Sequence, residues 1–164
     1  MKTLLLLRHA KSSWDNPSAR DFDRPLNKRG MKAAPLIGRY MRKRKVKPDL
    51  VVSSPAARAR RTAELVVEAA GIGAEIQLDE RIYEASTDQL MSIVAEVDES
   101  IDVMLLVGHN FGIEQFLERL TGGVHHMPTA ALARISLRLD HWGEIRDRAG
   151  TLDWLVKPKE LEEG

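Results

Sequence analysis

The sequence lacks cysteine altogether, which excludes a disulfide framework and any thiol chemistry. It also lacks a long apolar run. Residues 4–7 (LLLL) fall far short of the ~20 apolar residues that span a bilayer, and the arginine that follows them fits neither a signal peptide nor an anchor. We therefore expect a cytoplasmic protein without membrane contact.

Two kinds of ligand-binding motif are also missing. The glycines form neither a phosphate loop that ends in Gly-Lys-Ser/Thr nor a Gly-x-Gly-x-x-Gly fingerprint, which excludes nucleotide-loop chemistry. The five histidines show no His-x-His or His-Glu-x-x-His spacing, and His125, His126 and His141 are expected in loops or turns. We expect no metal and no cofactor.

A net charge of +1 gives no general attraction to nucleic acid. The cations that cluster at the end of a predicted helix are Arg39, Arg42, Lys43, Arg44, Lys45 and Lys47. Cations at a helix C-terminus complement the helix dipole, so we interpret the cluster as a solvated helix end and not as a nucleic-acid patch. A docking surface for an acidic partner is the other alternative.

What the sequence does contain is a set of apolar runs that end in polar side chains. Residues 3–10 (TLLLLRHA) end with Arg8 and His9, and residues 102–107 (DVMLLV) are followed within two positions by His109. In a parallel sheet, ligands bind outside the carboxyl ends of the strands. An imidazole beside a fixed cation at such a position suggests phosphoryl transfer.

A third apolar run, residues 50–52, leads through Ser54 into a helix predicted over 55–70. Ser54 suits the N-cap and Pro55 the first helical position, so free backbone N–H groups and the positive end of the helix dipole would meet the strand end. Arg58 in the first turn adds a fork of donors. Together the three strand ends predict an anion site.

Strands and helices alternate along the chain. After a polar loop at 11–26, expected to fold over the site, helices are predicted over 28–43, 55–70, 87–97 and 111–121, and further strands over 75–78, 131–139 and 151–156. Asn27 is expected to cap the first helix and Ser86 with Gln89 to form a capping box for the third. Each of the last two strands has one face that is more exposed to water, as is typical of strands at the edge of a sheet.

This order predicts an α/β fold, a three-layer sandwich with a mostly parallel central sheet and helices on both faces. The length favours one domain over two, because no linker divides the chain. We place that single domain at 1–158 and expect the charged tail at 159–164 to fray.

In chain order, these segments resemble the histidine phosphatase superfamily (phosphoglycerate mutase-like), and within it the SixA-type phosphohistidine phosphatases. The resemblance rests on LLLLRHAKSSW (4–14), DFDRPLNKRG (21–30), SSPAARARRTAE (53–64), LLVGHN (105–110) and MPTAALARISL (127–137). It covers most of the chain, which makes it more specific than a single tripeptide. Ala10 departs from the family's Arg-His-Gly signature, and this bears on the approach of the backbone to phosphate.

The resemblance implies that His9 is phosphorylated in turnover and that Arg8, Arg58 and His109 complete the phosphate pocket. Chemically, His9 must attack as the neutral imidazole, and nearby arginines would lower its pKa. Water would then attack the phosphohistidine. Arg8, Arg58 and a protonated His109 would neutralise the phosphoryl oxygens without a metal.

The acid position is less specific. Glu84 is the candidate proton donor for an ester substrate, and Glu80 lies close enough in the sequence to be an alternative. Hydroxyl and amide groups near the strand ends give further candidates for phosphate binding. These are Ser12, Ser13, Asn16 and Asn110.

Three functions follow from these residues. The first is a phosphatase that removes phosphate from protein phosphohistidine through a covalent intermediate on His9. The second is a phosphomonoesterase for small metabolites with Glu84 as general acid, and the third is a phosphate-binding signalling module without turnover. The expected partner is a phosphorylated protein or a small phosphate ester, and the sequence does not determine the oligomeric state.

Overall fold

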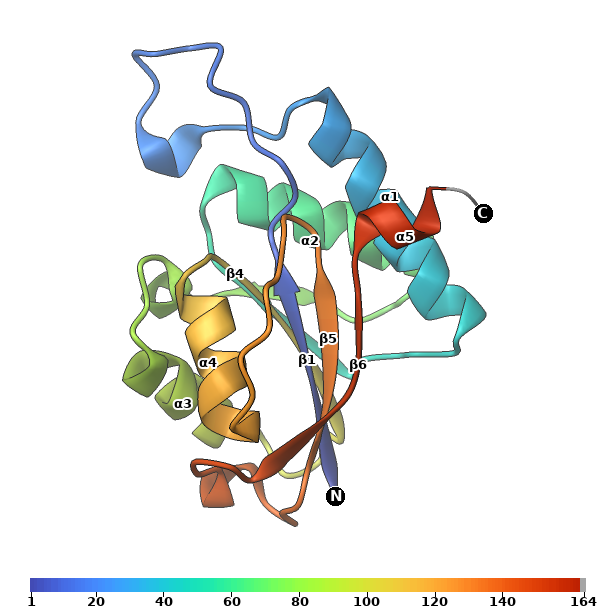
Figure 1. Ribbon diagram of the computed structural model, residues 1–164, viewed down its shortest axis with the longest axis vertical. Helices are drawn as coiled ribbons and strands as arrows, with labels where there is room; N and C mark the ends of the chain where they lie inside the picture. The colour runs from blue at the N-terminus through green and yellow to red at the C-terminus, as the bar shows by residue number, and fades with distance from the viewer. Residues whose placement is uncertain (163–164) are drawn as a thin grey trace.

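The computed structural model describes residues 1–162 (Figure 1). Its centre is a six-stranded sheet in the order β3-β2-β4-β1-β5-β6. The strands are β1 (Lys2–Arg8), β2 (Leu50–Ser53), β3 (Ile76–Leu78), β4 (Val103–Gly108), β5 (Leu132–Leu137) and β6 (Gly150–Val156). The first four run parallel to one another, and β5 is antiparallel to both β1 and β6. The predicted, mostly parallel sheet is confirmed.

Helices cover both faces of this sheet (Figure 1). They are α1 (Lys28–Lys43), α2 (Ala57–Ala70), α3 (Thr87–Ala95), α4 (Gly112–Thr121) and α5 (Pro158–Leu161), with 3₁₀ turns at Asp21–Asp23, Glu80–Ile82 and Trp142–Glu144. Leu5 and Leu7 of β1 face a core shared with α1 and α2, whereas Leu4 and Leu6 face a core shared with α3 and α4. Since successive strand residues point to opposite faces, one leucine run fills both cores. The predicted three-layer sandwich is confirmed.

The two central strands end level with each other. Arg8 of β1 pairs with Gly108 of β4, and the backbone N–H of His9 donates to the carbonyl oxygen of Gly108 at 3.0 Å. The residues that follow the two strands therefore emerge side by side at one edge of the sheet.

The predicted helix caps at two positions are confirmed. The side chain of Asn27 accepts a hydrogen bond from the N–H of Gly30 at the start of α1. Ser86 and Gln89 form the reciprocal capping box of α3. The helix itself ends at Ala95, two residues before the predicted end.

The prediction for the start of α2 is wrong. The helix begins at Ala57, and its N-cap is Ala56, which provides no side-chain cap. Ser54 instead accepts a hydrogen bond from the N–H of Ala56, a local contact that bends the chain between β2 and the helix. Arg58 still lies in the first turn, as predicted.

Two predictions for the C-terminal part of the chain need correction. β5 lies inside the sheet, because both β1 and β6 pair with it, so only β6 of the two is an edge strand. Residues 159–161 of the tail that was expected to fray belong to the helix α5, in which Leu161 packs against the core on the α1 side. Residues 163 and 164 of the predicted tail lie outside the described part of the chain.

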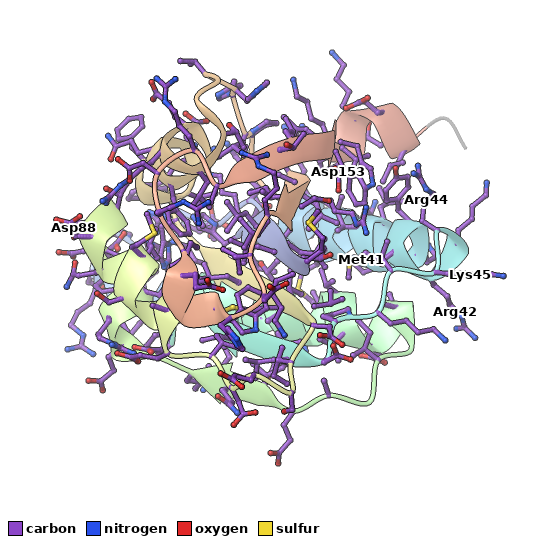
Figure 2. The ribbon with its side chains drawn as sticks, turned by 90° about the horizontal axis from the view of Figure 1, so that it is seen from below. Met41, Arg42, Arg44, Lys45, Asp88 and Asp153 are labelled. Atoms are coloured by element: carbon purple, nitrogen blue, oxygen red, sulfur yellow. The ribbon has the colours of Figure 1, made fainter. Side chains whose placement is uncertain are left out.

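The cations at the C-terminal end of α1 project outward from the helix, as Figure 2 shows for Arg42, Arg44 and Lys45. Arg44 donates to the hydroxyl of Tyr40 at 2.7 Å, and its guanidinium lies 5.6 Å from the ring centre of Trp154. This packing agrees with a solvated helix end.

Candidate active site

Three strand ends meet at one edge of the sheet, as the sequence predicts. The N–H of His9 donates to Gly108, and the N–H of Ser54 donates to the carbonyl oxygen of Val107 at 3.0 Å. The rings of His9 and His109 consequently lie 5.1 Å apart, centre to centre. Arg58 from α2 completes the group, with its Nε 3.4 Å from Nε2 of His9.

His9 is held in one orientation. Its Nδ1 lies 2.7 Å from the carbonyl oxygen of Ala10, and only 7% of the residue's surface is exposed. Burial, followed by the positive charges of Arg58, Arg8 and Arg24, lowers the pKa of His9 to about 4. The ring is therefore neutral near pH 7, with burial contributing more than the arginines that the sequence emphasised.

Arg58 is fixed by the loop that precedes α1. Its Nη1 donates to the backbone oxygen of Asp21 at 2.7 Å, and its Nη2 donates to Oδ2 of the same residue at 3.0 Å. The hydroxyl of Tyr83 donates to that carboxylate oxygen at 2.7 Å. The pKa of Asp21 is lowered, first by the Tyr83 hydrogen bond and then by Arg58, so the group is a carboxylate and not a proton donor.

Sequence reasoning missed both Asp21 and Tyr83. Asp21 lies inside the quoted DFDRPLNKRG segment, but nothing in that segment shows that it reaches a helix on another part of the chain. The loop at 11–26 does fold toward the site, since Asp21 connects it to both Arg58 and Tyr83.

Arg24 is a third residue of the site that sequence reasoning missed. The residue is only 7% exposed, and its Nη2 donates to the hydroxyl of Ser12. Its Nη1 lies 3.5 Å from Asp21, and the ring of Trp14 stacks on the guanidinium with 3.4 Å between Cζ and the ring centre. Burial lowers the pKa of Arg24, and its charge reaches His9.

His109 differs from the prediction in its charge. Burial, and then the neighbouring His9 and Arg58, lower its pKa to about 3, so the ring is neutral where a protonated form was expected. Its Nε2 lies 2.8 Å from the hydroxyl of Ser54, and Tyr83 packs edge-on against the ring. Its buried Nδ1 has no hydrogen-bond partner among the described residues.

Arg8 is anchored through the loop before β5. Its Nη1 donates to the carbonyl oxygen of Met127 at 3.0 Å, which also accepts from Asn110 at 3.2 Å. Glu114 holds the other side of the same residue by accepting from the N–H of Met127 at 2.7 Å and from Asn110 at 2.8 Å. The buried Nε of Arg8 has no partner among the described residues.

The predicted phosphate-binding hydroxyls and amides have contacts of their own. Ser12 binds Arg24, the hydroxyl of Ser13 accepts from the N–H of Asp15, and the exposed Asn16 accepts from Ser18. Asn110 binds Glu114 and Met127, with its buried Oδ1 unpartnered among the described residues. None of these contacts is made with His9, so their role in phosphate binding stays a prediction.

Both candidate acids are exposed. Glu84 follows Tyr83 in a left-handed turn with φ of 58°, and Glu80 lies in the preceding 3₁₀ turn. Within residues 1–162, no hydrogen bond joins either side chain to His9 or His109. Of the two, Glu84 is the one whose charge acts on Tyr83.

The remaining histidines lie outside this cluster. His126 pairs with Glu114 at 2.9 Å and His141 with Glu99 at 2.9 Å. In the described part of the chain, no group of three or more His, Asp or Glu side chains is placed to hold a metal ion.

The arrangement as a whole provides a neutral imidazole among guanidinium groups. Such a set of cationic donors around a neutral nucleophile suits the binding of an oxyanion. The model of the histidine phosphatase superfamily (branch 1) matches residues 4–104, which carry His9, Arg58 and the Asp21 loop. The chain belongs to the histidine phosphatase superfamily.

Solved structures of this superfamily share the fold over nearly the whole chain. A candidate SixA phosphohistidine phosphatase from Agrobacterium tumefaciens is 33% identical, with a TM-score of 0.83, and the match covers 96% of this chain and 98% of that one. The protein histidine phosphatase SixA complexed with tungstate is 22% identical, with a TM-score of 0.85 over 98% and 99% of the two chains, which shows the fold alone. Family and structural likeness together support phosphatase activity.

Among curated proteins, an uncharacterised chloroplastic protein of Arabidopsis thaliana is 29% identical over 95% of this chain and 76% of its own length. No helix within residues 1–162 is long and apolar enough to cross a bilayer.

Ala10 stands where the Arg-His-Gly signature has glycine, and its surroundings accommodate the methyl group. The residue is completely buried, and its N–H donates to the hydroxyl of Thr62 at 2.9 Å. Thr62 in turn donates to the backbone oxygen of Arg58 at 2.7 Å. The methyl group fills the core on the α1 side, and the backbone beside His9 is tied to the first turn of α2.

Proposed function

We propose that this protein removes phosphate from phosphohistidine on other proteins, with His9 as the nucleophile. The observation that carries the proposal is the neutral, oriented His9 ring among Arg8, Arg24 and Arg58, with no carboxylic acid hydrogen-bonded to it in the described chain. The nitrogen of phosphohistidine is a good leaving group, so such a site needs little help from a general acid.

The reaction has two steps. The lone pair on Nε2 of His9 attacks phosphorus, the P–N bond of the substrate breaks, and the leaving imidazole takes a proton from solvent. Water then attacks phosphorus, the bond to His9 breaks, and inorganic phosphate leaves with the ring neutral again. Arg8 and Arg58 stabilise the equatorial oxygens in both transition states.

Exposed apolar side chains around the strand ends support a protein as the substrate. Trp14 is 74% exposed and Phe111 is 76% exposed. They belong to two loops, one after β1 and one after β4, both at the edge of the sheet that carries His9. Exposed apolar groups gathered at one site are typical of surfaces that contact other proteins.

A metabolite phosphomonoesterase is the second candidate. It is favoured by the position of Glu84 next to Tyr83, whose ring packs against His109. If Glu84 turned toward a bound ester, it would supply the proton that an alkoxide leaving group needs.

Turnover of two substrate classes tests the proposal. One is a histidine-containing protein phosphorylated with phosphoramidate, and the other is a panel of small phosphate esters. We expect wild type to prefer the phosphoprotein, His9→Ala to lose both activities, and Glu84→Gln to keep phosphoprotein turnover. A preference for esters that depends on Glu84 would overturn the proposal, as would turnover that survives His9→Ala.

A further inference from the structure

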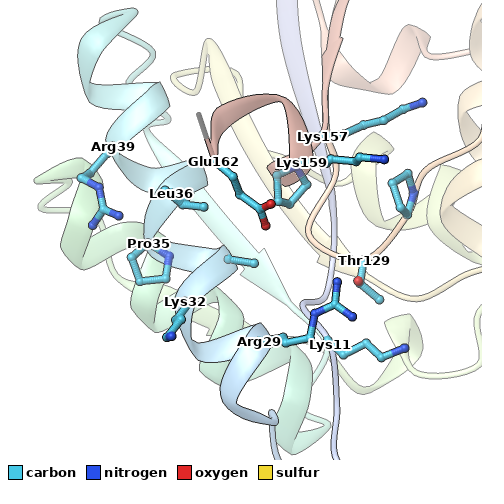
Figure 3. Close-up of a pocket in the computed structure, with 13 residues that line it drawn as sticks. Lys11, Arg29, Lys32, Pro35, Leu36, Arg39, Thr129, Lys157, Lys159 and Glu162 are labelled. Carbon is cyan, nitrogen blue, oxygen red and sulfur yellow. The ribbon is translucent and has the colours of Figure 1, made fainter. Parts of the chain in front are cut away.

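A large groove on the α1 side of the molecule is lined by charged side chains, and most of them are cationic. Its volume is about 970 Å³, and it lies between α1, α5 and the loop before β5. Its cationic side chains are Lys11, Arg29, Lys32, Arg39, Lys157 and Lys159, and its one carboxylate is Glu162. Figure 3 shows Arg29, Lys32 and Arg39 along one side of the groove, with Lys157 and Lys159 opposite.

These cations have no carboxylate partners, unlike several other cations of the described chain. Arg58, Arg81 and Arg119 each form ion pairs of 3.0 Å or less. Within residues 1–162, no ion pair involves any of the six cations of the groove. Six unneutralised charges around one concave surface favour an acidic occupant.

Apolar side chains line the groove as well. They belong to Ala33, Pro35, Leu36, Pro128 and Pro158. A free phosphate or a small anion would leave this apolar surface uncovered, whereas a peptide with acidic and apolar side chains would match both the cations and the apolar lining.

The groove adjoins the site without including it. His9, Arg58 and His109 do not line it, but its end is formed by Lys11 and Thr129 (Figure 3). Lys11 lies two residues after His9, and the residue after Thr129, Ala130, donates its N–H to the carbonyl oxygen of His9 at 3.0 Å. A protein whose phosphohistidine reaches His9 would therefore place its neighbouring surface over the groove.

We propose that this groove docks an acidic, partly apolar segment of the phosphoprotein substrate, beside its phosphohistidine. The inference rests on the proposed function, since it assigns the substrate's recognition surface. Docking raises the local concentration of the phosphoryl group at His9 without a change in the chemical step, so its loss appears in kcat/KM for the acidic substrate alone.

The experiment compares two phosphohistidine peptides, one flanked by Asp, Glu and Leu residues and one in which Asn and Gln replace the acids. The groove variant combines Lys32→Glu, Arg39→Glu and Lys159→Glu, at three exposed positions. The control variant combines Lys45→Glu, Lys47→Glu and Arg146→Glu, which lie outside the groove and change the net charge equally.

We expect wild type to prefer the acidic peptide in kcat/KM. The groove variant should lose about tenfold or more of that preference, and the control variant should keep it, because three attractive charges in the groove are replaced by three that repel the acidic peptide. A neutralising variant, with Gln at the same three positions, gives the same direction with less risk to folding. Equal preference in the groove and control variants would overturn the docking site.

Binding of the unphosphorylated acidic peptide, followed by fluorescence anisotropy, separates the two proposals. Binding that the groove variant loses supports the docking site even if no phosphohistidine is hydrolysed. Phosphohistidine turnover without such binding or peptide preference overturns the docking site and leaves the proposed function standing. Tighter binding of a single-stranded DNA of equal charge would also overturn it, by identifying a nucleic-acid surface.

Discussion

The Nδ1 atom of His9 lies 2.7 Å from the carbonyl oxygen of Ala10. Since a carbonyl oxygen can only accept a hydrogen bond, Nδ1 must carry the ring proton and Nε2 must hold the lone pair. Nε2 is also the atom that faces Arg58. The hydrogen bond to the carbonyl oxygen of Ala10 thus leaves Nε2 of His9 as the nucleophilic atom.

The first prediction concerns this atom. A phosphoenzyme trapped by rapid acid-free quenching should carry phosphate on Nε2 of His9, because Nδ1 is occupied by its hydrogen bond. Phosphorus–nitrogen couplings in NMR spectra of labelled protein distinguish the two isomers, and His9→Gln provides the blank. Phosphate on Nδ1 would show that the imidazole ring rotates before it reacts, so that Nδ1 faces the phosphoryl group.

The second prediction is an acid limit of activity below the usual histidine range. Burial and the surrounding arginines lower the pKa of His9 to about 4, so the nucleophile stays neutral as the pH falls from 7 toward about 4. We expect the acid limb of kcat/KM near that value, with His9→Ala run in parallel to subtract spontaneous hydrolysis of the phosphohistidine. An acid limb at pH 6.5, the ordinary value for histidine, would contradict the effect of burial.

The second prediction extends to stability, because the low pKa values of His9 and His109 make the fold sensitive to acid. The folded pKa values of His9 and His109, about 4 and about 3, lie below the value of 6.5 for the unfolded chain. The unfolded state therefore binds more protons at pH values below 6.5, and the free energy of unfolding falls as the pH drops through this range. Melting temperatures measured between pH 7 and 4 should fall more steeply for wild type than for a His9→Gln, His109→Gln variant.

The sequence predicts the members of the site that follow strands, and it misses those that loops deliver. Arg8, His9 and His109 are found because strand ends in a parallel sheet must share an edge, and Arg58 because it opens the next helix. Asp21 and Tyr83 reach the site by contacts across 37 and 62 residues, and Arg24 by a hydrogen bond across 12, which no local pattern encodes. The false N-cap at Ser54 has a similar cause, because its hydroxyl contacts His109 of another strand.

The third prediction tests Asp21. Asp21→Ala removes the carboxylate contact to Arg58 and the Tyr83 hydrogen bond, so Arg58 is no longer preorganised. We expect kcat/KM to fall by about tenfold, less than the roughly hundredfold or more for the loss of an oriented donor itself, because Arg58 keeps its contact with the backbone oxygen of Asp21. Asp23→Ala is the matched control, because Asp23 lies in the same turn and pairs with Arg20 instead. Equal losses in the two variants would indicate that only the loop, and not Arg58, is affected.

The fourth prediction tests the anchor of Arg8. Glu114 binds the N–H of Met127, whose carbonyl oxygen accepts from Arg8, so Glu114→Ala should loosen both the loop and the guanidinium. We expect a loss of about 2 kcal/mol in the free energy of unfolding, as for a removed charged hydrogen-bond acceptor, together with a lower kcat. Glu118→Ala, one turn later and exposed, should change neither in urea unfolding or turnover. An unchanged kcat in Glu114→Ala would show that Glu114 and Met127 do not position Arg8 for the reaction.

The fifth prediction concerns the packing of α1 against the strand that carries the nucleophile. A Cβ on Gly30 would lie 2.2 Å from the carbonyl oxygen of Lys11, so Gly30→Ala must push the start of α1 away from the backbone that follows His9. We expect a loss of about 1 to 3 kcal/mol in the free energy of unfolding, as for overpacked cores, and a drop in kcat/KM with it. Gly73→Ala is the control, because a Cβ there meets no atom within 4 Å. If urea unfolding gave the same midpoint for both variants, the close approach of α1 to Lys11 would not be a constraint on the site.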